Sequence, residues 1–273
     1  MKRTSQNSVG LLSVACLLAA QLTASAHAQQ KQADPDAQLL TYFYKDPRPE
    51  RLVGFAERYQ LRSNADKWSA YPPLVGFFAA VCTRYPIEFE GLVSLDLKPK
   101  MATAIAAAVR LCNNEAIATK LLPALQRNGA DKDLIAAFAA VPAKLDDVRI
   151  TTPTHLDILW GASFASGDAR YVATIVDYLE QTTNRSESTA LDVAQTVLAM
   201  AGGPKEILGQ LREKYGADGA RQIIYSASAL WALQSNAKQH EFVNQYVMRY
   251  VADHPGTPAT KALSVFLAKG RKT

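Results

Sequence analysis

The chain has 273 residues, of which 48% are hydrophobic and 20% charged, and its formal net charge is +5 at pH 7. This length allows one large domain or two small ones, with a sizeable core. Acidic and basic residues are interspersed, and the one basic cluster lies in the C-terminal tail, at residues 269–272. A nucleic-acid-binding protein normally carries a basic stripe with interleaved aromatic residues, so we expect no nucleic-acid partner.

The first 28 residues have the three zones of a cleavable signal peptide. Lys2 and Arg3 form a positive start, residues 9–20 are almost entirely apolar, and residues 26–28 read Ala-His-Ala, an A-x-A cleavage pattern. The apolar run is too short to cross about 30 Å of hydrocarbon as a helix, although an uncleaved anchor is the alternative. We therefore expect an exported protein, periplasmic or secreted, with a mature chain of about 245 residues and no transmembrane segment.

The cysteines fit an oxidising compartment. Removal of the signal peptide takes away Cys16, whose lipidation is the alternative, and leaves Cys82 and Cys112 as an even pair. Each of the two ends an apolar helical run, so neighbouring helices would place them at similar heights. The sequence predicts a Cys82–Cys112 disulfide, which would stabilise the fold by ~3–4 kcal/mol on the chain-entropy estimate. Two buried free thiols are the alternative.

Helical periodicity dominates the mature chain. Alanine-rich runs at 102–108 and 136–140 suit close helix packing. Apolar residues then recur at three- and four-residue spacing in four later segments, residues 156–164, 172–179, 223–231 and 243–251. Prolines stand where helices should begin or loops should lie, at positions 47, 72, 99, 153, 204 and 258. The pattern predicts an all-α fold of roughly a dozen helices.

Four similar polar turns separate these helices, at residues 45–48, 112–115, 166–169 and 234–237. Each follows an apolar run and precedes an amphipathic helix, which is typical of capped helix ends. Their recurrence predicts stacked αα-hairpins, a degenerate, solenoid-like helical repeat.

Residues 141–153 are the best candidate for a domain boundary, because polar residues and two prolines gather there. They would separate an N-terminal helical half, residues 29–140, from a C-terminal helical half, residues 154–273. A long loop within one continuous stack is the alternative.

No catalytic, metal-binding or nucleotide-binding motif is complete. Fragments of hydrolase and zinc-site motifs occur at Ser163, Ser235 and His240, but their partner residues are missing. We therefore expect no metal and no cofactor, and the sequence favours a binding protein over an enzyme.

One group of residues suggests a binding surface. Trp160 and Trp231 occupy matching positions before two of the polar turns, and stacked hairpins would bring their polar neighbours to one concave face. Indole, amide and imidazole groups bind peptides or sugars in such grooves. The candidate binding residues are Asp157, Trp160, Trp231, Asn236, Gln239 and His240. Alternatively, both tryptophans are core residues and the polar groups are helix caps.

The same two regions carry a resemblance. Residues 156–168, LDILWGASFASGD, and residues 229–240, ALWALQSNAKQH, resemble segments of a family of uncharacterised exported proteobacterial all-α proteins. The likeness extends over residues 46–250. It implies an architecture, because the family has no assigned activity.

The leading hypothesis is an exported helical-repeat protein that binds a peptide or protein partner. The first alternative is a hydrolase that acts on an envelope polymer through Asp157 or His240. The second is a carrier of a small apolar ligand between helices. The sequence does not determine the oligomeric state.

Overall fold

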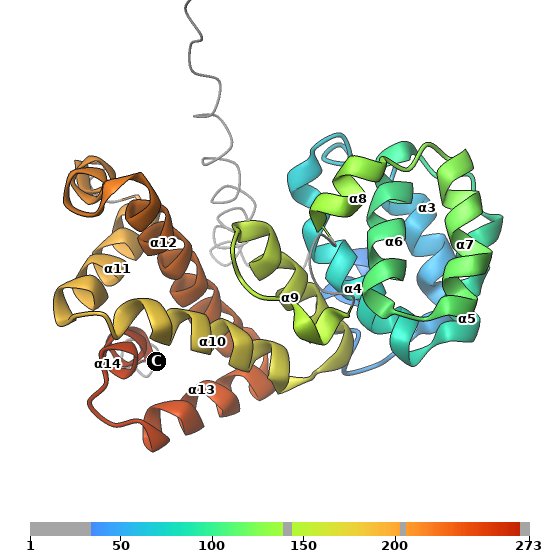
Figure 1. Ribbon diagram of the computed structural model, residues 1–273. Helices are drawn as coiled ribbons and strands as arrows, with labels where there is room; N and C mark the ends of the chain where they lie inside the picture. The colour runs from blue at the N-terminus through green and yellow to red at the C-terminus, as the bar shows by residue number, and fades with distance from the viewer. Residues whose placement is uncertain (1–33, 139–143, 203–205, 268–273) are drawn as a thin grey trace, which may run out of the picture. The chain divides into compact units, whose positions relative to one another are not determined.

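The computed structural model describes residues 34–138, 144–202 and 206–267. The predicted signal peptide lies outside these residues, and so does the start of the predicted boundary segment. Every regular element of the described chain is a helix (Figure 1), and the predicted all-α class is confirmed. None of the described helices combines the length and the apolar character needed to cross a membrane. The stacked-hairpin repeat stays a prediction.

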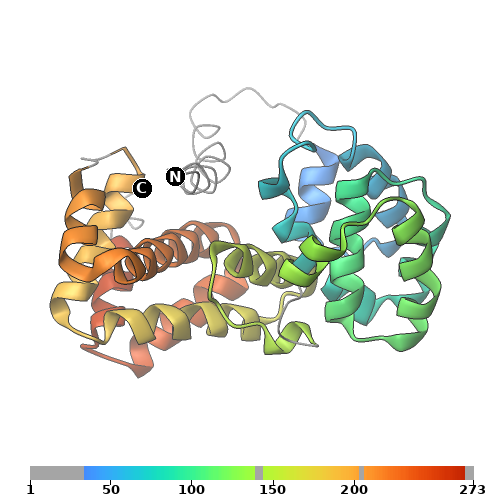
Figure 2. The ribbon, with the colours of Figure 1, turned by 45° about the horizontal axis from the view of Figure 1, so that its top comes forward.

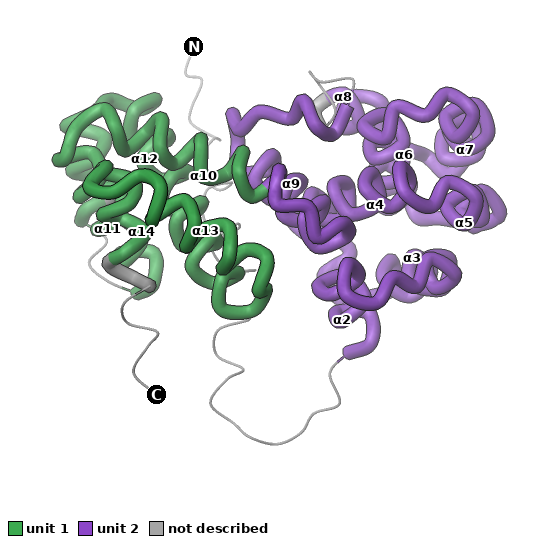
Figure 3. The backbone as a smooth tube through the Cα atoms, turned by 90° about the horizontal axis from the view of Figure 1, so that it is seen from below, with its two compact units in different colours: residues 1–25, 172–273 green, residues 26–171 purple. Residues whose placement is uncertain are grey.

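By its contacts the chain divides into two compact units (Figure 3). Unit 2 is Ala26–Tyr171, and unit 1 contains Val172–Thr273. The division therefore follows Tyr171, whereas the sequence suggests a boundary at residues 141–153. A linker role for that segment stays a prediction, because residues 139–143 lie outside the described chain.

Unit 2 contains eight of the described α-helices and four short 3₁₀ helices. The α-helices are α2 (Pro35–Tyr42), α3 (Leu52–Tyr59), α4 (Pro72–Arg84), α5 (Pro86–Glu90), α6 (Pro99–Cys112), α7 (Glu115–Arg127), α8 (Lys132–Phe138) and α9 (Pro153–Ser166). The 3₁₀ helices are η2 (Pro49–Arg51), η3 (Trp68–Ala70), η4 (Gly91–Ser94) and η5 (Leu145–Asp147). The apolar helix α4 lies at the centre and packs against both α6 and α9, while α7 covers the far side of α6 (Figures 1 and 2).

The α4–α9 contact depends on two glycines. A Cβ atom on Gly76 would lie 1.7 Å from the carbonyl oxygen of Ile158, and one on Gly161 would lie 1.8 Å from that of Pro73. Real Cβ atoms do not approach so closely, so only glycine lets the two backbones touch. The contact holds the C-terminal end of α9 beside that of α4, where the Arg84 side chain reaches the Ser166 carbonyl.

The predicted pairing of Cys82 with Cys112 is confirmed as a disulfide-distance pair, with Cα atoms 5.9 Å apart. Cys82 lies in the last turns of α4, and Cys112 is the last residue of α6. The two helices therefore run in the same direction and end at the same end of unit 2.

Unit 1 is built from the remaining helices. These are α10 (Ala169–Thr183, from Val172 onward), α11 (Glu187–Met200), α12 (Glu206–Gln239), α13 (Glu241–Asp253) and α14 (Pro258–Leu267). Helix α12 packs against α11, α13 and α14. It is interrupted at Gly216, whose φ of 69° and ψ of 179° are accessible to glycine but strained for other residues.

Polar residues cap two of the four predicted turns as expected. Asn114 Oδ1 accepts a hydrogen bond from the backbone N–H of Ile117 at 3.2 Å, and Asp168 Oδ1 accepts one from that of Arg170 at 2.9 Å. The turn predicted at residues 234–237 is wrong, because α12 continues through it to Gln239. Its backbone stays helical there, and the N–H of His240 still donates to the carbonyl of Asn236 at 2.8 Å.

Candidate functional site

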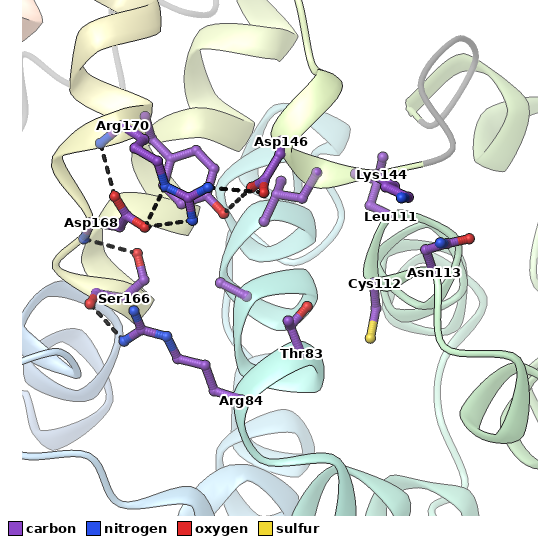
Figure 4. Close-up of a pocket in the computed structure, with 13 residues that line it drawn as sticks. Thr83, Arg84, Leu111, Cys112, Asn113, Lys144, Asp146, Ser166, Asp168 and Arg170 are labelled. Carbon is purple, nitrogen blue, oxygen red and sulfur yellow. Dashed lines mark hydrogen bonds and ion pairs between the residues drawn. The ribbon is translucent and has the colours of Figure 1, made fainter.

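A pocket of about 310 Å³ opens in unit 2 where three helices end (Figure 4). The C-terminal ends of α4, α6 and α9 meet η5 and the first turn of α10 there. The lining residues are Ala80, Thr83, Arg84, Leu111, Cys112, Asn113, Lys144, Leu145, Asp146, Ser166, Asp168, Arg170 and Tyr171. All of them belong to unit 2.

The pocket combines an apolar floor with a polar rim. Ala80, Leu111 and Leu145 are buried core residues that contribute the floor. Cys112 adds one sulfur of the disulfide, so its thiol is not available as a nucleophile. Charged and amide side chains supply the rim, an arrangement typical of sites that bind one end of a small ligand in an apolar recess and orient the other by hydrogen bonds.

Arg84 lies in the last turn of α4 and caps the C-terminal end of α9. Its Nη1 donates to the backbone carbonyl of Ser166 at 2.7 Å (Figure 4). A cation at this position satisfies a carbonyl that has no partner within its own helix, and it offsets the negative end of the helix dipole.

Arg170 is the centre of an ion-pair network on the opposite wall. Its Nε and Nη2 donate to Asp168 Oδ2 at 2.9 and 2.8 Å, and its Nη1 donates to Asp146 Oδ2 at 3.1 Å. The hydroxyl of Tyr171 donates to Asp146 Oδ1 at 3.0 Å. Both carboxylates and the guanidinium are thus held in place before any ligand arrives, because each is bonded to a neighbour (Figure 4).

The network shifts the ionisation of its members. Burial by itself would raise the pKa of Asp168, but the hydrogen bonds and charge of Arg170, with the charge of Arg84, outweigh it and lower that pKa. Burial, reinforced by the negative charge of Asp146, raises the pKa of the Tyr171 hydroxyl. At neutral pH Asp168 is therefore a carboxylate and Tyr171 a neutral phenol.

The candidate binding residues predicted from the sequence lie outside this pocket. In unit 2, Asp157 and Trp160 are on α9. Trp160 is only 5% exposed and stacks on Phe164 with ring centroids 5.8 Å apart. Asp157 is half-buried, and burial raises the pKa of its carboxyl group to about 7. The burial of the Trp160 indole supports the alternative that it is a core residue.

The other four candidates are in unit 1. Trp231 and Asn236 lie within α12, where Trp231 is half-buried and Asn236 buried. Gln239 ends the helix and is exposed, and His240, which follows it, is only 1% exposed. Because these residues and the pair on α9 belong to different units, their convergence in one groove stays a prediction.

The predicted polar turns at 112–115 and 166–169 and the predicted boundary segment at 141–153 contain some of the pocket residues, but the sequence assigns no role to Arg84 or Arg170. One signal was available: the Asp-x-Arg spacing of Asp168 and Arg170 repeats that of Asp46 and Arg48, in the two turns whose sequences match best. Both pairs form ion pairs, the Asp46–Arg48 pair at 3.0 Å and the Asp168–Arg170 pair at 2.8 Å. The two turns also lie together, since the backbone N–H of Tyr44 donates to the carbonyl of Phe164 at 3.1 Å.

Within the described part of the chain, no group of three or more histidine, cysteine, aspartate or glutamate residues is arranged to hold a metal ion. Comparison of the chain with protein-family models, with curated proteins and with solved structures finds no match.

Proposed function

We propose that this is an exported binding protein that holds a short segment of a peptide or protein partner in the pocket of unit 2. The observation that carries the proposal is the pocket itself, a recess of about 310 Å³ with an apolar floor and a rim of prearranged charges. Polar groups that are already fixed lose little conformational freedom on binding, which favours affinity. The burial of Trp160 supports placing the site in this pocket instead of at the tryptophans.

The test is to block the pocket and measure partner capture from the envelope of the organism that makes the protein. Thr83 is an exposed residue of α4 that lines the pocket, and its hydroxyl bonds the carbonyl four residues earlier. Thr83→Trp should fill the recess and reduce recovery of a cross-linked partner at least tenfold.

Thr119 is the matched control. It is also exposed on a helix, α7, makes the same hydrogen bond to the carbonyl four residues earlier, and does not line the pocket. Thr119→Trp should capture as much partner as the wild type. Equal capture by the two tryptophan variants, or capture by neither of them nor by the wild type, would contradict the proposal.

The hydrolase alternative is supported by Asp157, since burial raises its pKa to about 7, a value suited to a general acid. Hydrolysis of an envelope polysaccharide normally needs a second carboxyl group beside the first. The two carboxylates of the pocket are bonded to Arg170, an arrangement that favours binding over acid–base chemistry. The apolar-carrier alternative is less favoured, because charged side chains form the rim of this pocket.

A further inference from the structure

The charged side chains of the pocket indicate whether its ligand is anionic or cationic. Three cationic side chains line it, those of Arg84, Lys144 and Arg170. Arg170 is bonded to both Asp146 and Asp168, so these three groups together keep a surplus of one negative charge. An anionic ligand group would therefore be recognised by the other two cations, Arg84 and Lys144.

Lys144 and Arg84 both have N–H groups that can still donate hydrogen bonds to a ligand. Among the described residues, the ammonium group of Lys144 has neither a hydrogen bond nor an ion pair, and Arg84 uses one of its donors on the Ser166 carbonyl. Both side chains are exposed, and the amide of Asn113 lies beside Lys144 at the rim (Figure 4). Arg84 also acts on Asp168 through its charge, whereas Lys144 forms no ion pair among the described residues. The two exposed cations together favour an anionic ligand group over a cationic one.

The helix ends narrow the choice of anion. Three α-helices point their C-terminal ends at the pocket, and such ends present backbone carbonyl groups and a partial negative charge. These carbonyls repel any anion, and they repel a doubly charged phosphate or sulfate more strongly than a singly charged carboxylate. A peptide carboxyl terminus offers such a singly charged carboxylate, and the amide N–H groups that precede it can donate hydrogen bonds to the carbonyls.

The apolar floor and the volume of the pocket indicate the size and character of the rest of the ligand. Ala80, Leu111 and Leu145 are apolar, and a recess of about 310 Å³ has room for one or two small residues. We propose that the pocket binds the carboxyl terminus of a peptide chain: Lys144 pairs with the terminal carboxylate, and the apolar floor receives the last side chain. Arg84 adds positive potential from the α4 side. This inference rests on the proposed function and names the part of the partner that is recognised.

The experiment uses fluorescein-labelled pentapeptides that end in alanine, valine or leucine, each made with a free carboxylate and as the C-terminal amide. Anisotropy titration of the full mature protein should show that the acids bind at least tenfold more tightly than the amides. This factor corresponds to one charge-assisted hydrogen bond. Acetate should displace the peptide acids more effectively than inorganic phosphate at equal concentration.

Lys144→Ala should weaken the binding of the peptide acids about tenfold and leave the binding of the peptide amides unchanged. Lys67 is the matched control, an exposed lysine of unit 2 that lies outside the pocket, and Lys67→Ala should bind as the wild type does. Equal binding of acids and amides, absence of binding by every peptide, or stronger displacement by phosphate would each overturn the inference. The proposed function fails separately, when Thr83→Trp leaves partner capture unchanged.

Discussion

Asp157 is the described carboxyl group whose ionisation departs most clearly from that of a free aspartate. It is half-buried on α9, and burial raises its pKa from 3.8 to about 7. The Asp36 side chain is also buried, but its pKa shifts in the opposite direction. There, burial would raise the pKa, but Arg58 at 2.6 Å and Arg62 at 3.2 Å outweigh it and lower the pKa. Burial with a cationic partner and burial without one thus shift the same group in opposite directions.

The raised pKa of Asp157 has a consequence for stability. Between about pH 4 and pH 7 the folded protein holds a proton that the unfolded chain has released, so this group makes stability fall as the pH rises through that window. Asp157→Asn keeps the shape of the protonated acid and carries no charge. We expect it to be more stable than the wild type at pH 8, by roughly 1–3 kcal/mol, and equally stable near pH 4.

Urea unfolding at several pH values measures this difference. Asp253→Asn, at an exposed aspartate of α13, is the control and should change the free energy of unfolding little at any pH. Parallel pH profiles for the wild type and Asp157→Asn would show that Asp157 is charged in the folded protein, contrary to expectation.

The packing of α4 against α9 determines where the pocket can form. Gly76 and Gly161 let the two backbones touch, and the disulfide holds the end of α6 beside the end of α4. Neither constraint contributes a charged group to the pocket. Together they bring three helix ends to one place, and the charged residues Arg84, Asp168 and Arg170 lie at or just beyond those ends.

A methyl group at the glycine contact should therefore be costly. Gly161→Ala places a Cβ atom 1.8 Å from the Pro73 carbonyl oxygen, so the helices must move apart. We expect a loss of about 3 kcal/mol in the free energy of unfolding. Gly209→Ala is the control, since nothing lies within 4 Å of its Cβ position, and it should be neutral or stabilise α12 by about 0.5–1 kcal/mol. Equal changes in melting temperature for the two variants would rule out the close contact.

For the whole chain, the predicted signal peptide and the disulfide depend on each other. The predicted cleavage after residue 28 would remove Cys16 and leave a single pair, and the predicted export would bring that pair to a compartment in which cysteines oxidise. The contact between α4 and α6 already places the two cysteines with Cα atoms 5.9 Å apart, within the range of native disulfides.

Intact mass of the protein purified from an exporting host tests both statements. We expect the mature chain to begin at Gln29, or at His27 if the earlier small-residue site at 24–26 is used. Alkylation under denaturing conditions should add no label without reductant and two labels after reduction. A mass that includes residues 1–26, or two labels without reductant, would contradict the corresponding prediction.

The sequence by itself determined what depends on neighbours along the chain. Helical periodicity and capping residues such as Asn114 and Asp168 act within one or two turns, so the all-α class and helical segments such as residues 156–164 were predictable. The error at residues 234–237 has the same origin, because Ser235 and Asn236 favour a turn locally while the helix that contains them stays intact. The Cys82–Cys112 pair was predictable because only two cysteines remain after the predicted cleavage. Only the tertiary structure decided the pocket: Arg84, Lys144 and Arg170 come from three segments with no common pattern, and their meeting depends on backbones that touch at Gly76 and Gly161.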